Sequence, residues 1–239
     1  MENAHGTDEP KRSMPAPGRS ITEFIVNSIG EMIITGHYDT TPFPTEDELA
    51  LQLRFSRTAV RESFKMLAAK GLLSARPRHG TFVQPESEWH LFDPDVLRWL
   101  CRRIPSKSSL RHFASLCIVV EPAAAGLAAR CSSLPKLGAL RESFDRVVRA
   151  HEGEDDLFDA SMSFHFAVLE ATDNPLFMQF RGVVQTALFM AARLRIRLNL
   201  NHTPIQYYAA VMTAIQEGDG VNASRSMYRV AQESLLLTE

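Results

Sequence analysis

The sequence predicts a mainly α protein in two parts: a small helical domain with one short β-hairpin, followed by an all-α antiparallel helical bundle. Apolar residues recur at helical spacing from Ile21 onward, and only residues 72–76 and 81–84 have strand character. Beyond Pro85, prolines and glycines divide the chain into further helical segments. Hydrophobic residues make up 45% of the 239 residues, and no apolar run approaches the ~20 residues that span a bilayer.

Residues 1–19 combine prolines, glycines and charges without an apolar period, so we expect a flexible arm. The first helix begins at Ile21, where apolar side chains form one stripe, and Gly36 ends it. A second helix begins after Thr45. Thr45 and Glu48 have the spacing of a capping box, in which each side chain accepts a hydrogen bond from the other residue's backbone amide.

A third helix is expected from Arg57 to about Lys70, with Ser56 as its N-cap. Two short strands around a turn at 77–80 follow it. Helix, helix, basic helix and hairpin is the order of a winged helix-turn-helix domain, which we assign to residues 20–85.

The remaining residues, 86–239, predict one all-helical domain that is long enough to bury its own core. Its expected helices cover residues 94–103, 107–131, 135–151, 154–172, 174–199, 203–217 and 219–237.

Charge is distributed unevenly along the chain. Residues 54–78 carry a net charge of +6, whereas the rest of the chain carries −8. A compact basic segment on an acidic body indicates a surface that binds polyanions, although a solvated helix face would give the same local charge.

The third expected helix has two stripes at helical spacing. The apolar stripe consists of Val60, Phe64 and Leu67, and the basic stripe of Arg57, Arg61 and Lys65. A helix that packs by one side and presents arginines on the other fits the DNA major groove, where guanidinium groups match guanine edges and phosphates. Ser56 and Thr58 stand at the N-terminus of this helix, where hydroxyls and free backbone amides suit a phosphate.

These residues resemble the N-terminal DNA-binding domain of the GntR family of bacterial transcription regulators. The matching motifs are Pro44-Thr45-Glu46, Leu49-Ala50, Ser56 to Glu62, Leu67, Gly71-Leu72-Leu73 and Gly80-Thr81-Phe82-Val83. The resemblance implies that operator DNA is contacted by Ser56, Arg57, Thr58 and Arg61, with His79 and Gly80 in the minor groove; we add Arg54 and Lys65 from the basic segment.

Two positions depart from the family pattern. Asp47 stands where the family usually has arginine, so we expect that phosphate contact to be lost or replaced. Arg54 stands near a turn where the family usually has glycine.

The second part resembles the FadR-like branch of the same family, whose all-helical effector domain is called FCD. The matching segments are Glu121 to Ala125, Leu127 to Ala129, Phe164-His165, Asn174-Pro175, Ala214-Ile215 and Gly218-Asp219. The segment Trp89–Leu100 also resembles galactonate-operon repressors of this branch.

Members of the branch usually hold a divalent metal with an aspartate and three histidines. The corresponding places here are Ser161, His165, Tyr208 and Val230, which retain one ligand of four. We therefore expect no metal and no cofactor, because zinc needs about four N, O or S donors. A metal-dependent regulator of the same branch is the alternative.

We expect the effector to bind the protein directly, through Ser161, His165, Tyr208 and an arginine such as Arg181 or Arg193. The alternative for His165 is a core histidine with one hydrogen-bond partner.

Together these features predict a ligand-responsive DNA-binding transcription regulator, expected to repress a catabolic operon for a sugar acid or another small organic acid. We expect a cytoplasmic homodimer that binds double-stranded operator DNA and no membrane, because the N-terminus lacks a signal peptide's basic head and apolar centre. No nucleophile motif, phosphate-binding loop or dinucleotide fingerprint is present, which argues against a hydrolase or another enzyme. The basic stripe argues against an adaptor that does not bind DNA.

Overall fold

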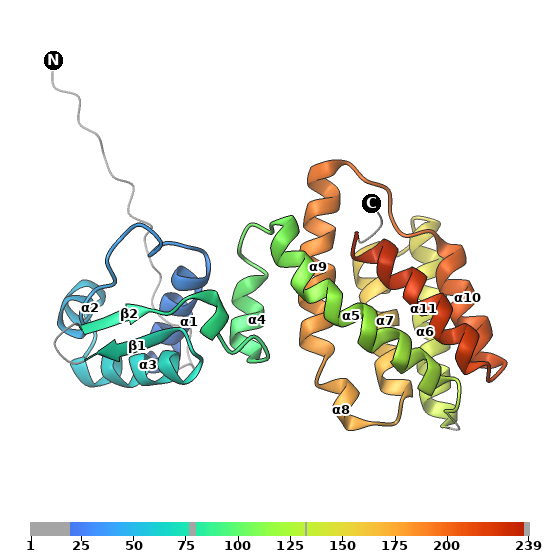
Figure 1. The fold of residues 1–239 in the computed structure, drawn as a ribbon, viewed down its shortest axis with the longest axis horizontal. Helices are drawn as coiled ribbons and strands as arrows, with labels where there is room; N and C mark the ends of the chain where they lie inside the picture. Colours follow the sequence, from blue (N-terminus) through green and yellow to red (C-terminus); the bar gives the residue numbers. More distant parts are fainter. Residues whose placement is uncertain (1–19, 77–79, 132, 237–239) are drawn as a thin grey trace, which may run out of the picture. The chain divides into compact units, whose positions relative to one another are not determined.

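The computed structural model describes residues 20–76, 80–131 and 133–236. The chain forms two compact units, one running through His90 and the other from Leu91 (Figure 1). The expected boundary lay earlier, at Pro85. The segment after Pro85 belongs to the first unit because Trp89 Nε1 donates to the Gln84 carbonyl at 2.9 Å and the His90 amide donates to the Lys70 carbonyl at 3.0 Å. The predicted arm at 1–19 and His79 of the predicted turn lie outside the described residues.

The first unit has the expected element order. It comprises α1 (Ile21–Ile34), α2 (Glu46–Leu53), α3 (Arg57–Ala69), β1 (Leu73–Arg76), β2 (Gly80–Val83) and a short 3-10 helix (Glu86–Glu88). Both α1 and α2 pack on α3, and their buried faces enclose Ile25, Ile29, Leu49, Val60 and Leu67. The predicted capping box of α2 is confirmed, because Thr45 Oγ1 accepts from the Glu48 amide at 3.3 Å and Glu48 accepts from the Thr45 amide at 2.8 Å.

The hairpin after α3 is antiparallel, with Leu73 opposite Val83 and Arg76 opposite Gly80. Gly71 connects α3 to β1 with φ of +76°. A Cβ at this position would collide with the Glu88 carbonyl oxygen, so both the left-handed backbone and the close approach require glycine here.

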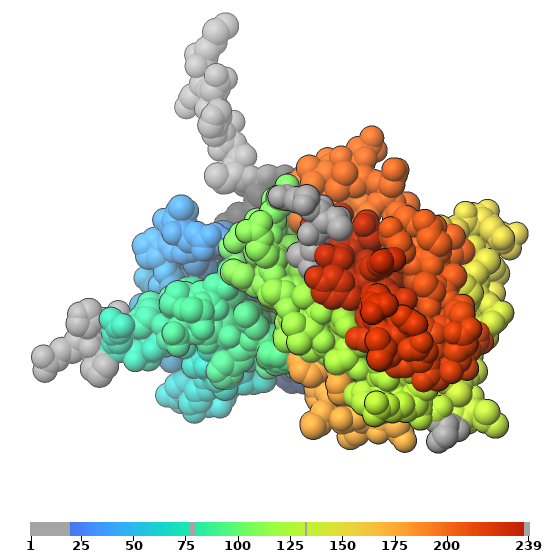
Figure 2. All heavy atoms as spheres, turned by 45° about the vertical axis from the view of Figure 1, so that its right-hand side comes forward, coloured from blue at the N-terminus to red at the C-terminus, as the bar shows by residue number. Residues whose placement is uncertain are grey.

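The described residues of the second unit form helices and connecting loops, with no strand. Its helices are α4 (Pro94–Leu100), α5 (Lys107–Ala128), α6 (Leu134–His151), α7 (Leu157–Ala171), α8 (Pro175–Met178), α9 (Arg181–Leu198), α10 (Ile205–Gln216) and α11 (Gly220–Ser234). Helix α5 packs against α7, α9 and α11, while α6 packs on α7 and α10 on α11. Helices α5 (green) and α11 (red) lie side by side on the face shown in Figure 2. The predicted fold class, mainly α with a hairpin in the first part and an all-helical second part, is confirmed.

The structure corrects one expected helix. Residues 174–199 form α8 and α9 instead of one continuous helix, with a break at Gln179 and Phe180. No glycine or proline marks the break in the sequence. The ring of Phe180 makes an edge contact with Phe92 at 5.9 Å between centroids, so packing against a residue far away in the sequence accompanies the change of direction.

By length and mean hydropathy alone, α5 meets the criteria for a membrane-spanning helix. Its apolar character has another cause here, because α5 is the helix against which α7, α9 and α11 pack. It also carries a buried glutamate, Glu121, in the middle of the packed face.

Candidate DNA interface and effector pocket

Helix α3 separates an inward face from an outward face as its sequence predicts. Val60, Phe64 and Leu67 are buried, whereas Arg57, Arg61 and Lys65 are exposed. The Ser56 side chain caps the helix by accepting from the Ala59 amide at 3.2 Å. This bond uses a lone pair of the hydroxyl, so its proton can still be donated to a phosphate. The outward face of α3 therefore presents cations and hydroxyl donors together, while their DNA contacts stay a prediction.

Asp47 of α2 forms an ion pair with Arg57 of α3. Asp47 Oδ1 lies 3.2 Å from Arg57 Nε, and the two side chains are 62% and 77% exposed. The acid that replaces the family's usual arginine is thus paired with a predicted DNA contact. An ion pair this exposed is weak in water, so Arg57 can exchange Asp47 for a phosphate.

Three further positions of the predicted DNA-binding surface have defined geometry. Arg54 ends α2 with φ of 56°, the left-handed conformation that glycine usually supplies at a helix C-terminus, and its side chain is exposed. On the hairpin, the Arg76 guanidinium lies over the Phe82 ring at 4.8 Å from the centroid. Gly80 is exposed with open space around it, which permits close approach of a DNA backbone.

A pocket of about 360 Å³ lies in the helical unit, among α7, α9, α10, α11 and the segment before α10. We call it the Tyr208 pocket. Its polar lining consists of Ser161, Arg195, Asn199, His202, Thr203, Tyr208 and Ser234, and leucines, Phe158, Ala192 and Ile196 supply the apolar lining. Its volume is within the range of small-molecule sites, about 300–1,000 Å³. Two predicted effector residues, Ser161 and Tyr208, therefore line one pocket.

The hydroxyl groups of this pocket form a connected network. Tyr208 Oη is hydrogen-bonded to Ser161 Oγ at 2.7 Å and to Ser234 Oγ at 3.4 Å, and Ser234 Oγ is hydrogen-bonded to Thr203 Oγ1 at 3.1 Å. Burial raises the pKa of Tyr208, so its hydroxyl stays neutral at physiological pH. The network can both donate to and accept from a ligand.

His165 is buried in the core between α5 and α7, where its ring makes an edge contact with the Tyr208 ring at 6.3 Å between centroids. Its Nδ1 donates to Glu121 Oε2, and both side chains are buried. His165 Nε2 and Glu121 Oε1 have no hydrogen-bond partner among the described residues. His165 is thus a core histidine with one hydrogen-bond partner, which was the alternative given for it from the sequence. It does not line the Tyr208 pocket.

The two arginines named from the sequence also lie away from this pocket. Arg181 stacks over the Phe166 ring at 4.3 Å, and Arg193 donates to the carbonyls of Cys101 and Arg103, at 3.0 Å each. The pocket instead contains Arg195, which sequence reasoning missed. No sequence signal separates Arg193 from Arg195, because both fall within the same basic end of the α9 sequence.

The donor set does not fit the metal that the family resemblance implies. Ser161 and Tyr208 offer neutral hydroxyls, Val230 is buried and offers no donor, and His165, whose Nδ1 is hydrogen-bonded to Glu121, is the one ordinary metal ligand among the four places. In the part of the chain that the structure describes, no three His, Cys, Asp or Glu side chains are grouped as a metal site. Four N, O or S donors around one ion are therefore not available at these places.

Comparisons with known proteins agree with this division of the chain. Residues 21–83 match the family model described as bacterial regulatory proteins, gntR family, and residues 113–233 match the FCD domain. The galactonate operon transcriptional repressor of Escherichia coli is 28% identical over 209 residues, covering 86% of this chain and 91% of the relative. A probable D-xylose utilization operon transcriptional repressor of Paenarthrobacter nicotinovorans is 32% identical over 131 residues, covering 54% of this chain and 49% of the relative. The solved structure of Lar from Listeria monocytogenes has the same fold, with a TM-score of 0.58 and 16% identity over 91% of this chain and 96% of that one.

An exposed basic helix with a hairpin and a helical domain with its own pocket thus define a DNA-binding transcription regulator and not an enzyme. More particularly, the chain belongs to the GntR family of bacterial regulatory proteins, in the branch that carries an FCD domain.

Proposed function

We propose that this protein represses a catabolic operon for a sugar acid or another small organic acid, and that the acid relieves repression by binding the helical domain. The observation that carries the proposal is the combination, in one chain, of the exposed basic face of α3 with the Tyr208 pocket. Two relatives support it: one is the repressor of a galactonate operon, which concerns a sugar acid, and the other is a probable repressor of a D-xylose utilization operon, which concerns a sugar.

The proposed mechanism uses a cytoplasmic homodimer on a near-palindromic operator. Two copies of α3 and its hairpin read two half-sites. A small acid in each helical domain favours a state in which the spacing of the two DNA-binding domains no longer matches the spacing of the half-sites. The acid can shift this equilibrium only if it binds the two states with different affinity.

The effector binds protein groups and no metal in this proposal. The residues at the four ligand places support it, because only His165 among them is an ordinary metal ligand and zinc needs about four N, O or S donors. Elemental analysis of untagged protein checks this expectation, and about one zinc or nickel ion per chain would contradict it.

The DNA half of the proposal is tested with an operator selected from random duplexes by the wild-type protein. We expect the double substitution Arg57→Ala, Arg61→Ala to abolish the specific gel shift while circular dichroism is unchanged, because both side chains are exposed. The matched control is Arg141→Ala, Arg225→Ala, which removes the same charge from exposed positions of the helical unit. Wild-type operator affinity in the Arg57, Arg61 variant would contradict the assignment of α3.

A further inference from the structure

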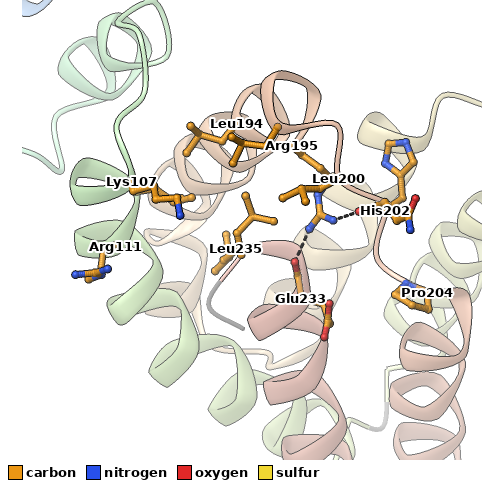
Figure 3. A pocket seen from close by; sticks show the side chains of 13 residues that line it. Lys107, Arg111, Leu194, Arg195, Leu200, His202, Pro204, Glu233 and Leu235 are labelled. Atoms are coloured by element: carbon orange, nitrogen blue, oxygen red, sulfur yellow. Dashed lines mark hydrogen bonds between the residues drawn. The ribbon is translucent and has the colours of Figure 1, made fainter. Parts of the chain in front are cut away.

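The guanidinium of Arg195, near the end of α9, lies in a wall shared by two pockets. Arg195, Leu200 and His202 line both the Tyr208 pocket and a second pocket of about 720 Å³. We call the second one the Lys107 pocket; Lys107 and Arg111 of α5 lie across it from Arg195 (Figure 3). A charged group in this position is accessible to a small ligand even though Arg195 itself is only 9% exposed.

Arg195 is a buried cation held by neutral groups. Its Nη1 donates to the Asn201 carbonyl and its Nη2 to the Glu233 carbonyl, as the dashed lines in Figure 3 show. Among the described residues, Arg195 forms no ion pair, although the negative charge of the Glu233 side chain favours its charged form. Burial lowers the pKa of Arg195, but a guanidinium stays charged in proteins. Because buried charges are normally paired, a carboxylate placed beside this guanidinium would be a favourable partner for it.

Beside the Arg195 guanidinium, the Tyr208 pocket offers hydroxyl groups that can bind the hydroxyls of an anionic ligand. Four hydroxyl groups, those of Ser161, Thr203, Tyr208 and Ser234, line it and can donate or accept. No aspartate or glutamate is among its described lining residues, so no side chain of that lining carries a negative charge that would repel a carboxylate.

The Lys107 pocket offers a poorer fit for such a ligand. Lys107 and Arg111 add positive charge there, but the pocket also includes Glu233, and leucines form much of its wall. The hydroxyl network is absent from its described lining.

Building on the proposed function, we infer that the effector is an open-chain sugar acid of about five or six carbons whose carboxylate pairs with Arg195. Its hydroxyl groups exchange hydrogen bonds with the network of Ser161, Tyr208, Ser234 and Thr203. Arg195 thus supplies the positive charge that recognises the acid, and the hydroxyl network distinguishes a sugar acid from a simple fatty acid. Charge-assisted and bidentate hydrogen bonds from arginine are among the strongest contacts to carboxylates.

The ligand class is tested by calorimetry on the full chain with matched probes. The sugar acids are D-gluconate, D-galactonate and D-xylonate; hexanoate keeps the carboxylate without hydroxyls, and sorbitol keeps the hydroxyls without the carboxylate. We expect at least one sugar acid to bind and to release the selected operator, while hexanoate and sorbitol do neither at the same concentration.

The anchor is tested with Arg195→Gln, which keeps hydrogen-bond donors for the two carbonyls but removes the charge. We expect it to weaken binding of that sugar acid about tenfold or more, and Tyr208→Phe to weaken it about two- to tenfold. The matched control is Arg197→Gln, an exposed position on the same helix, which should bind like the wild type. Retained operator binding and an unchanged circular dichroism spectrum show that the Arg195 variant is folded.

Two results would overturn the inference and leave the proposed function standing. One is wild-type sugar-acid affinity in Arg195→Gln. The other is release of the operator by an acid without hydroxyls, such as hexanoate or succinate, when the sugar acids have no effect. If no acid in the panel changes operator binding, the proposed ligand response fails as well.

Discussion

Single residues decide how strongly the outward face of α3 can attract DNA. Asp47 places a carboxylate beside Arg57, within a surface whose other charged groups include Arg61 and Lys65. The pair is exposed, so water and salt screen it. Its main effect is therefore on phosphate attraction and much less on folding stability.

Replacing this acid should tighten DNA binding. We expect Asp47→Asn to lower the Kd for the selected operator about two- to fivefold, with a similar gain for unrelated duplexes, because phosphate attraction is independent of sequence. Fluorescence anisotropy over a range of salt concentrations measures both effects. Asp145→Asn is the control, since it breaks an exposed pair with Arg141 in the helical unit. Equal or weaker binding by the Asp47 variant would contradict this role.

A second residue-scale feature is the buried pair of Glu121 and His165. Each side chain has one polar atom engaged by the other and one without a partner among the described residues. Removing one of the two side chains leaves the other buried without a hydrogen-bond partner. Removing both leaves no polar atom of the pair in the core.

We expect the pair to show strong non-additivity. Glu121→Met and His165→Met should each cost about 1–3 kcal/mol of unfolding free energy, and the double variant should cost less than the sum by roughly 1 kcal/mol or more. Urea unfolding followed by circular dichroism measures the cycle. Additive losses would mean that the two side chains contribute independently.

At the scale of elements, α5 and α11 approach closely where two glycines face each other. A Cβ at Gly220 would lie 2.8 Å from the Gly126 carbonyl oxygen, and a Cβ at Gly126 would lie 3.1 Å from the Gly220 carbonyl oxygen. Each contact is with backbone, which cannot rotate away as a side chain does. The absence of a side chain therefore sets the distance between these helices.

Gly220→Ala should force the two helices apart. We expect a loss of about 1–3 kcal/mol in unfolding free energy, as in other overpacked sites. Gly138→Ala is the matched control: this glycine is exposed within α6 with no atom near its Cβ position, so alanine should be neutral or stabilise by roughly 0.5–1 kcal/mol. Thermal unfolding measures the melting temperatures of both variants, and we expect that of Gly220→Ala to be the lower. Equal melting temperatures would contradict the close approach of α5 and α11.

At the scale of the whole molecule, the proposed function requires two copies of the chain. One short basic helix with a hairpin covers a single half-site, and specific DNA affinity generally needs more contact than that. We expect a homodimer, so light scattering at micromolar concentration should give about twice the 26.8 kDa of one chain. A mass near 26.8 kDa would contradict the two-half-site mechanism.

The sequence by itself determined most of the elements, though not the break between α8 and α9, and it determined the outward face of α3, because these features depend on residues close together in the chain. Helical periodicity places Val60, Phe64 and Leu67 on one side and Arg57 and Arg61 on another, whatever the rest of the molecule does. The capping box of Thr45 and Glu48 is equally local, since its partners are three residues apart. The family motifs fall within these same short segments.

Only the tertiary structure decided which side chains meet in the helical unit. Glu121 and His165 are 44 residues apart, and Ser161 and Tyr208 are 47 apart, so their contacts depend on how separate helices pack. The same packing turns Arg195 into the pocket and directs Arg193 to the carbonyls that follow α4. Periodicity shows which residues share a face of a helix, but the neighbour that each face meets is set by contacts between distant parts of the chain.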